Sequence, residues 1–244
     1  MNLNSNSSTR VRAPDLFGLQ PSSQMTNNHF HDEPASNLQT RRAASERRAS
    51  CIQSFLKCKR TMKICTFNGQ TLNQSHSLGE LCTDAKQYNL TLTAIQEHRF
   101  YHTDNIRVQE LNKDFTLITA SAYKNTINAT VGGVGFLINT QYVTAITNIT
   151  KLSKRIIKID FAGNPATTVL SCHSPHNKSS DQDIIEFYNN LSDAIEDIPA
   201  HNVLFLLGDF NAKIGPASAH FTYSNSTNKN WTYLLNLIEN HHCK

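Results

Sequence analysis

Asp209 and Asn211 are two polar residues that closely follow an apolar run, residues 203–207, in the stretch Gly208-Asp209-Phe210-Asn211. A carboxylate can orient a water molecule or bind a metal ion, and an amide can donate a hydrogen bond to a phosphate oxygen. Such groups at the end of a strand, held by a rigid sheet, suit phosphate chemistry. The same four residues also fit a capped strand-to-loop turn without any chemistry, and this stretch alone leaves both interpretations open.

Polar residues also follow three other expected strands: Asn68 after residues 62–67, Glu97 after residues 90–96 and His173 after residues 166–172. An expected helix at residues 78–88 lies between the first two strands, so they form a right-handed βαβ unit with parallel strands. The carboxyl ends of these strands then share one edge, where α/β sheets bind ligands. We therefore expect Asn68 and Glu97 to converge, although Glu97 also fits an exposed carboxylate paired with Arg99.

The elements that must position these residues follow from the hydrophobic pattern. Strands are expected at residues 115–121, 133–139, 142–149, 155–161 and 203–207, the last buried on both faces. Helices are expected at residues 78–88, with Ser77 as N-cap, at about residues 181–198 and at residues 231–239. The glycine-rich stretch at residues 132–138 lacks a following helix and a Lys-Ser/Thr pair, so it is no phosphate loop. Its small residues are expected to let two sheets pack closely.

Charge is unevenly distributed along the 244 residues, of which 39% are hydrophobic and 17% charged. Residues 1–60 hold nine of the 23 Lys and Arg residues and four of the 19 Asp and Glu residues. Residues 61–244 therefore hold fourteen basic and fifteen acidic residues and are close to neutral. Residues 1–60, rich in Ser, Asn and Arg, predict a disordered basic tail. This tail fits a solvated arm, a loose nucleic-acid contact or a nuclear import signal. Residues 61–244 are expected to form the folded domain.

Several classes of protein are excluded by what the sequence lacks. No stretch approaches the roughly 18 apolar residues that span a bilayer, and the N-terminus has no apolar segment of a secretory signal. The six cysteines show no Cys-x-x-Cys spacing. We therefore expect no membrane partner, no zinc site and no disulfide framework. The expected location is intracellular, in the nucleus or the cytoplasm, and not secreted.

Five motifs, in order and spacing, resemble the endonuclease/exonuclease/phosphatase superfamily with its DNase I-like fold. They are Phe67-Asn68, Ile95-Gln96-Glu97, Gly133-Val134-Gly135, His173-Ser174-Pro175 and Gly208-Asp209-Phe210-Asn211-Ala212. Two further motifs, Ser174-Pro175-His176-Asn177 and Thr227-Asn228-Lys229-Asn230, are similar to sequences in endonuclease domains of non-LTR retrotransposons of the RTE/CR1 kind and in craniofacial development protein 2-like proteins. The resemblance covers roughly residues 62 to 244. It implies a four-layer α/β sandwich of two sheets, incomplete at the C-terminus.

The resemblance also implies a role for each matching residue. Glu97 would be the main carboxylate on a single Mg²⁺, with Asn68 beside it, and no small-molecule cofactor would be needed. Asp209 would activate the attacking water, and Asn211 would hold the scissile phosphate. His173 would donate to the same phosphate. Asn177 and Arg99 would contact the nucleic acid, which we expect to be DNA.

The sequence departs from the family at two places. The family usually has Tyr where this chain has His173, and it ends with a Ser-Asp-His strand, whereas only His220, His241 and His242 follow Asn211 here. Two functions are therefore expected as alternatives. One is a Mg²⁺-dependent endonuclease that nicks target DNA for retrotransposition, weakened or inactive in this chain, with a reverse-transcriptase region in a longer parent protein. The other is a non-catalytic relic or domesticated fragment that binds nucleic acid or protein.

Overall fold

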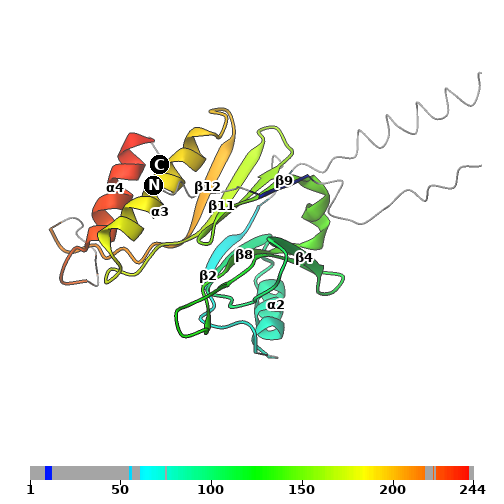
Figure 1. Ribbon diagram of the computed structural model, residues 1–244. Coiled ribbons are helices and arrows are strands. Elements are labelled where there is room, and N and C mark those ends of the chain that lie inside the picture. The colour runs from blue at the N-terminus through cyan, green and yellow to red at the C-terminus, as the bar shows by residue number, and fades with distance from the viewer. Residues whose placement is uncertain are drawn as a thin grey trace, which may run out of the picture.

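The computed structural model describes residues 9–12, 55–56, 61–74, 76–217, 222 and 224–241 (Figure 1). Most of the predicted tail lies outside these residues. Two parts of it are described: the short strand β1 (Thr9–Arg12) and Phe55, whose ring stacks on Phe161 at 3.9 Å between centroids. The predicted boundary after residue 60 stays a prediction.

Two five-stranded sheets form the centre of the molecule. The first sheet has the order β1-β9-β10-β11-β12, with β9 at Ile146–Ser153, β10 at Ile156–Phe161, β11 at Thr167–His173 and β12 at Val203–Asp209. The second sheet has the order β2-β3-β8-β5-β4, with β2 at Ile64–Asn68, β3 at Leu92–Gln96, β8 at Val134–Asn139, β5 at Phe115–Ala120 and β4 at Ile106–Glu110. A separate hairpin pairs β6 (Tyr123–Lys124) with β7 (Thr130–Val131).

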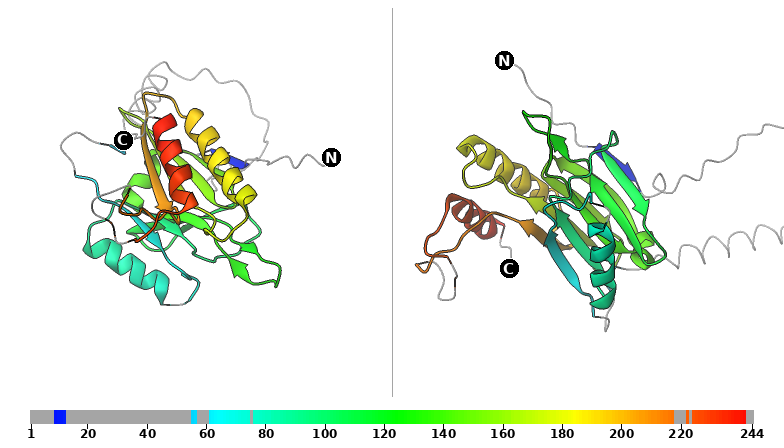
Figure 2. Two further views of the ribbon diagram at one scale, coloured as in Figure 1. Left: turned by 90° about the vertical axis from the view of Figure 1, so that its left-hand side faces the viewer. Right: turned by 90° about the horizontal axis from the view of Figure 1, so that it is seen from below.

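Helices cover the outer faces of both sheets. Helix α2 (Ser77–Gln87) lies on the second sheet, and α3 (Asp181–Glu196) and α4 (Lys229–Asn240) lie side by side on the first (Figures 1 and 2). The two sheets face each other between these helices. The four-layer α/β sandwich expected from the resemblance is therefore confirmed.

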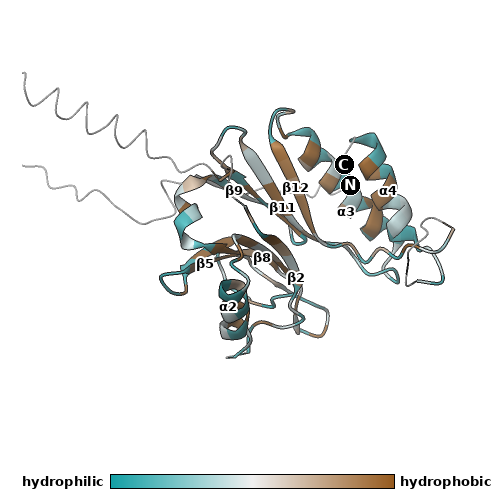
Figure 3. Ribbon diagram, turned by 180° about the vertical axis from the view of Figure 1, so that it is seen from behind, coloured by the Kyte–Doolittle hydropathy of each residue, from teal (hydrophilic) through white to brown (hydrophobic). Residues whose placement is uncertain are grey.

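Each layer boundary has its own hydrophobic core, and the hydrophobic strands are visible in Figure 3. Between the sheets lie side chains such as Phe136, Ile149 and Ile159, all fully buried. A second cluster joins the first sheet to α3 and α4, and a third lies beneath α2. Burial of the α3 face follows the predicted helical period, with Ile184 and Leu191 at 0% exposure.

Helix starts agree with the sequence less well than helix positions do. Ser77 was expected to cap α2, but the cap is His76, which makes no side-chain capping bond, and Ser77 is the first helical residue. Its backbone N–H instead donates to the Gln74 carbonyl in the preceding turn. In contrast, side chains do cap the other two helices, from Ser180 and Asn228.

One expected strand begins later than predicted, and one strand was not predicted. The expected strand at 142–149 begins only at Ile146, because a 3₁₀ helix (Thr140–Ala145), capped by Asn139, precedes β9. No strand range was predicted at Ile106–Glu110, where the structure has β4. Gly135 has a reason inside its own sheet to lack a side chain, because a Cβ there would collide with the Ile118 carbonyl of β5. The expected role of the small residues at 132–138 in packing the two sheets closely stays a prediction.

Strand β12 differs from the expected fully buried strand. Its residues are all half-buried, although Phe205 and Leu207 face the core between the sheets while Leu204 and Leu206 face the helices. The reason is its place in the sheet: within the described part of the chain it pairs only with β11 and forms the edge. A groove of about 760 Å³ runs beside it, lined by residues including Ile198, Leu206 and Leu234.

Two further sequence expectations concern membranes and cysteines. Within the described ranges, no helix is long and apolar enough to cross a membrane. The three described cysteines, Cys65, Cys82 and Cys172, are free thiols.

Candidate active site

Four strand ends bring Asn68, Glu97, His173 and Asp209 together. Strands β2 and β3 are parallel and in register, as are β11 and β12, so each pair ends at a common edge. The two sheets then place these edges face to face. The Asn68 amide nitrogen lies 2.7 Å from Asp209 Oδ2 and 3.4 Å from Glu97 Oε1, and His173 Nε2 lies 3.4 Å from the same Glu97 oxygen.

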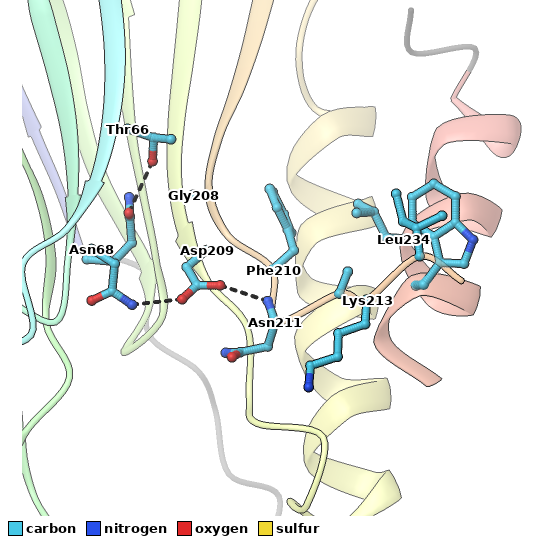
Figure 4. Close-up of a pocket in the computed structure, with 12 residues that line it drawn as sticks. Thr66, Asn68, Gly208, Asp209, Phe210, Asn211, Lys213 and Leu234 are labelled. Carbon is cyan, nitrogen blue, oxygen red and sulfur yellow. Dashed lines mark hydrogen bonds between the residues drawn. The ribbon is translucent and has the colours of Figure 1, made fainter. Parts of the chain in front are cut away.

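Asp209 is held by hydrogen bonds on both of its carboxylate oxygens. Oδ2 accepts from the side chain of Asn68, and Oδ1 accepts from the backbone N–H of Asn211 at 2.9 Å (Figure 4). The carboxylate is thereby fixed in one orientation. Such an oriented carboxylate can take a proton from a water molecule that approaches a phosphate.

Asn211 lies beside Asp209 but is itself engaged. Its side-chain nitrogen donates to the Ser174 carbonyl at 2.9 Å, which ties the loop after β12 to the loop after β11. Its backbone has φ of +48°, an uncommon value outside glycine. The expected role of its amide toward a phosphate stays a prediction.

His173 is the most deeply buried of the converging side chains, with 5% of its surface exposed. Burial lowers the pKa of its imidazole to about 4, assisted by the nearby positive charge of Arg155 and opposed by Glu97 and Asp209. Arg155 also donates to the His173 carbonyl at 3.1 Å. The ring is therefore neutral at physiological pH. Among the described residues its Nε2 atom has no hydrogen-bond partner, although it lies 3.4 Å from Glu97 Oε1.

The two predicted nucleic-acid residues differ in position. Arg99 lies beside the converging groups, with its guanidinium Nη2 3.6 Å from Glu97 Oε2, so the predicted Glu97–Arg99 pair is present. Asn177 is exposed in the turn that follows β11, and the structure gives it no contact with the four converging side chains. Both assignments to nucleic acid stay predictions.

The loop after β3 has an unusual backbone. Glu97 and Arg99 have φ of +54° and +58°, and between them His98 is fully buried. The His98 ring accepts from the Phe100 N–H at 2.9 Å and donates to the Val134 carbonyl at 3.2 Å. A side chain on Gly133 would collide with this ring. Strained backbone held by its surroundings is typical of functional sites, and here it aims Glu97.

A buried polar bridge beneath the site was missed from the sequence. Gln96 donates to Ser171 Oγ at 3.1 Å and accepts from Thr66 Oγ1 at 3.1 Å, while Ser171 Oγ donates to the Ile95 carbonyl. The two bonds of Ser171 join the two sheets directly under the converging residues, and the Thr66 bond holds Gln96 in place within the second sheet. A glutamine inside an apolar strand was the available signal, because a buried polar side chain requires partners.

Asn228 and Asn230 also have positioning roles that the sequence motif alone did not assign. Asn230 is fully buried, accepts from Ser174 Oγ at 3.0 Å and donates to the Pro175 carbonyl at 3.0 Å. Asn228 donates to the Asn211 carbonyl at 2.8 Å. The start of α4 thus fixes the loops that follow β11 and β12.

A cavity of about 500 Å³ opens beside Asp209. It is lined by residues including Asn68, Asp209, Asn211, Lys213 and Trp231, several of which are shown in Figure 4. Lys213 is exposed and brings a positive charge to this cavity. An anionic substrate would therefore meet both hydrogen-bond donors and a cation beside the oriented carboxylate.

The C-terminal histidine that the structure describes lies elsewhere. His241 Nε2 is 2.7 Å from Ser192 Oγ of α3, so it belongs to the packing of the two helices. His220 and His242 fall outside the described residues.

The converging groups fit one divalent cation held by few protein ligands. Glu97 supplies a carboxylate, and the buried nitrogen of His173 lacks a partner. The Asn68 side chain turns its nitrogen toward the carboxylates, while its oxygen accepts from the Gln70 N–H at 3.2 Å. No group of three or more His, Cys, Asp or Glu in the described residues could hold a metal ion. Sparse protein ligation with several waters is typical of Mg²⁺.

No protein-family model matches the chain. Among solved structures, the 3′ phosphatase NExo from Neisseria, bound to a product DNA hairpin, aligns with a TM-score of 0.54 at 14% identity over 73% of this chain and 71% of that one. The AP endonuclease LMAP from Leishmania major aligns with a TM-score of 0.55 at 9% identity over 86% and 78%.

The chain has the DNase I-like fold of the endonuclease/exonuclease/phosphatase superfamily. The DNase I-like fold predicted from five short motifs is therefore confirmed. In this fold, the converging strand ends described above are the candidate active site. At such low identities the solved structures show the fold and leave the activity to be argued from residues.

Curated relatives by sequence are craniofacial development protein 2 of Bos taurus, 27% identical over 159 residues, and of Tragulus javanicus, 28% identical over 169 residues. These stretches cover 65% and 68% of this chain but 25% and 28% of the relatives. The chain therefore spans about a quarter of the length of the curated relatives it matches. The predicted likeness to craniofacial development protein 2 is confirmed, and the retrotransposon likeness stays a prediction.

Proposed function

We propose that the chain is a DNA-acting phosphodiester hydrolase of the DNase I-like kind, with Mg²⁺ as its metal. The convergence of Asn68, Glu97, His173 and Asp209 from four strand ends carries this proposal. The fold is shared with NExo, which is described as bound to a product DNA hairpin, and with an AP endonuclease. The finer assignment, an endonuclease that nicks target DNA for retrotransposition, is also part of the proposal.

Each residue has a task that its contacts support. Glu97 and Asn68 would hold the divalent ion, which supplies Lewis-acid stabilisation of charge on the phosphate. Asp209, oriented by Asn68 and the Asn211 N–H, would accept the proton of the attacking water. Asn211 and His173 would donate to the phosphate oxygens.

The phosphodiester backbone also meets favourable charge at the rim of the site. Lys213 lines the cavity beside Asp209, and Arg99 lies next to Glu97. Cations close to the scissile bond bind phosphates without reading sequence, so such contacts position the strand. Asn177, exposed after β11, is proposed to contact the same strand.

A supercoiled-plasmid nicking assay with Mg²⁺ tests the proposal. The chain should nick the plasmid, and Asp209→Asn and Glu97→Gln, which keep size but remove charge, should each lower the rate at least about 100-fold. The matched control is Asp193→Asn, at an exposed position on α3. Equal nicking by all three variants would assign the activity to a contaminant and reject the proposed site.

A binding-only protein is the second candidate. One observation favours it: the Asn211 side-chain nitrogen, expected to donate to the phosphate, already donates to the Ser174 carbonyl at 2.9 Å. In that case the folded chain would bind a DNA duplex without nicking it. Gel-shift titration beside the nicking assay separates the two candidates, because Lys213→Ala would weaken binding in both, whereas Asp209→Asn would affect only cleavage.

A further inference from the structure

A cavity of about 450 Å³ lies on the outer face of the second sheet. Leu117 and Thr119 of β5 line it together with Gln109 and Arg107, the residues opposite them on β4. Residues directly opposite each other in an antiparallel pair point to the same face of a sheet. Leu117 belongs to the cluster beneath α2, so this face is the outer one, and Leu78 of α2 also lines the cavity. The proposed function gives this cavity no role.

Arg99 connects the cavity to the candidate active site. It lines the cavity, and its guanidinium Nη2 lies 3.6 Å from Glu97 Oε2. Its backbone N–H donates to the Gly132 carbonyl at 3.0 Å, which fixes the loop after β3 against the end of the β6–β7 hairpin. Within the described part of the chain its Nε atom has no hydrogen-bond partner, so the protein does not saturate the guanidinium. A ligand in the cavity therefore lies next to the groups that converge at Glu97.

The lining of the cavity suits a nucleotide. Phe100 and Leu117 give it an apolar part, and Asn73 and Gln109 bring exposed amide groups. Amide side chains hydrogen-bond the edges of nucleobases, whose flat faces are apolar. The volume also lies within the range of about 300–1,000 Å³ that is usual for small-molecule sites.

Tyr101 and three cations stand around the opening of this cavity. The Tyr101 ring is 57% exposed, and the Lys124 ammonium lies 5.2 Å from its centroid. Arg107 is paired with Asp104 at 3.2 Å, but both side chains are exposed and such a pair contributes little, so a phosphate can replace the carboxylate. An exposed aromatic ring beside cations, here with Arg99 as the third, is how proteins bind single-stranded nucleic acid.

We propose that this cavity binds an unpaired nucleotide of the DNA strand next to the scissile bond, with the base stacked on Tyr101 and the phosphate held by Arg107 and Arg99. The inference deepens the proposed function and rests on it, because it names the DNA structure that the site recognises. A paired base inside a duplex has both faces covered by its neighbours, so only an unpaired base can stack on a side chain. The favoured substrate is therefore a duplex with unpaired nucleotides beside the cleaved bond.

Binding is measured by fluorescence anisotropy in EDTA, so that no cleavage occurs. One probe is an uninterrupted duplex, and the other has the same sequence with a short single-stranded gap. The wild type should bind the gapped probe at least about fivefold more tightly, the lower end of what stacking of one base contributes. Tyr101→Ala should bring the two affinities to within about twofold of each other, because that stacking is lost. Arg107→Gln should weaken binding of the gapped probe about tenfold, as expected for a charged hydrogen-bond donor.

Matched controls are available elsewhere on the chain. Tyr88→Ala removes a ring that is 59% exposed at the end of α2, and Lys113→Gln removes a positive charge in the turn between β4 and β5. Both variants should keep the preference for the gapped probe. Circular dichroism verifies that each variant folds, and the exposure of Tyr101 and Arg107 favours folding of their variants.

The outcomes separate this inference from the proposed function. Equal affinity of the wild type for both probes, or a preference that Tyr101→Ala leaves unchanged, would overturn the inference, while nicking that depends on Asp209 would still support the hydrolase. A preference that depends on Tyr101, without such nicking, would support the nucleotide site and reject the hydrolase. Titration with deoxyadenosine monophosphate tests the other source of the same chemistry. Binding of this free nucleotide that requires Tyr101, without any preference between the probes, would overturn the assignment to DNA.

Discussion

Acidification from pH 7 to pH 5 should destabilise the fold through His98, the buried ring beneath the loop of Glu97. Its Nδ1 accepts from the Phe100 N–H and its Nε2 donates to the Val134 carbonyl, so the native ring must be neutral. Burial lowers the pKa of His98 to about 4. A second proton would remove the acceptor of the Phe100 N–H and leave a buried charge.

The sign and size of the effect follow from linkage. Between the folded pKa of about 4 and the unfolded pKa of 6.5, the unfolded chain binds more protons, so the free energy of unfolding falls as pH falls. At pH 5 the unfolded imidazole is nearly all protonated and the folded one about a tenth, which gives a loss of about 2 kcal/mol relative to pH 7. The loss grows to about 3 kcal/mol below pH 4.

Urea unfolding of the wild type and His98→Gln at pH 7 and pH 5 measures this contribution. Whatever its effect at pH 7, the variant should lose about 2 kcal/mol less than the wild type on acidification, because glutamine does not titrate. The control is His201→Gln at an exposed position. His173 adds a loss of the same sign in both proteins, since burial also lowers its pKa to about 4. An equal acid-induced loss in wild type and His98→Gln would refute the reasoning.

Three further predictions concern packing and chemistry elsewhere. Gly208→Ala should cost about 1–3 kcal/mol in urea unfolding, because its Cβ would collide with the Cys172 carbonyl, whereas Gly79→Ala in α2 meets open space and should be neutral or stabilising. Asn230→Ala should lower the free energy of unfolding by about 1–3 kcal/mol, since it leaves buried partners such as Ser174 Oγ without their bonds. Cys172 should resist a thiol reagent, read by mass spectrometry of the labelled peptide, until urea unfolds the chain, because burial raises the pKa of its thiol.

The sequence was most informative where a strand or helix follows one regular period. The α3 pattern correctly predicted the buried face with Ile184, and the strand ends at Asn68 and Asp209 were located to within one and two residues, respectively. Convergence of Asn68 with Glu97 followed from the rule that parallel strands share an edge. What the sequence could not supply was the pairing between sheets, because Asn68 and Asp209 are separated by 141 positions and belong to different sheets.

Two glycines show why some predictions from the local sequence failed. Gly208 was interpreted as a turn residue, but it lies inside β12, where close approach of Cys172 excludes a side chain. Gly133 makes room for the His98 ring, a contact between residues from different strands and loops. Both explanations are tertiary, so no window of neighbouring residues could reveal them.

The candidate site and the packing of the sheets depend on the same contacts. Asn68 of one sheet donates to Asp209 of the other, and beneath them Gln96 donates to Ser171 across the same interface. Both bonds join the two layers, and the Asn68–Asp209 bond also orients a candidate catalytic group. A change that separates the sheets would remove the site before the individual strands unfold, since no single sheet contains both Glu97 and Asp209. Loss of nicking at urea concentrations below the main unfolding transition is the expected sign of this dependence.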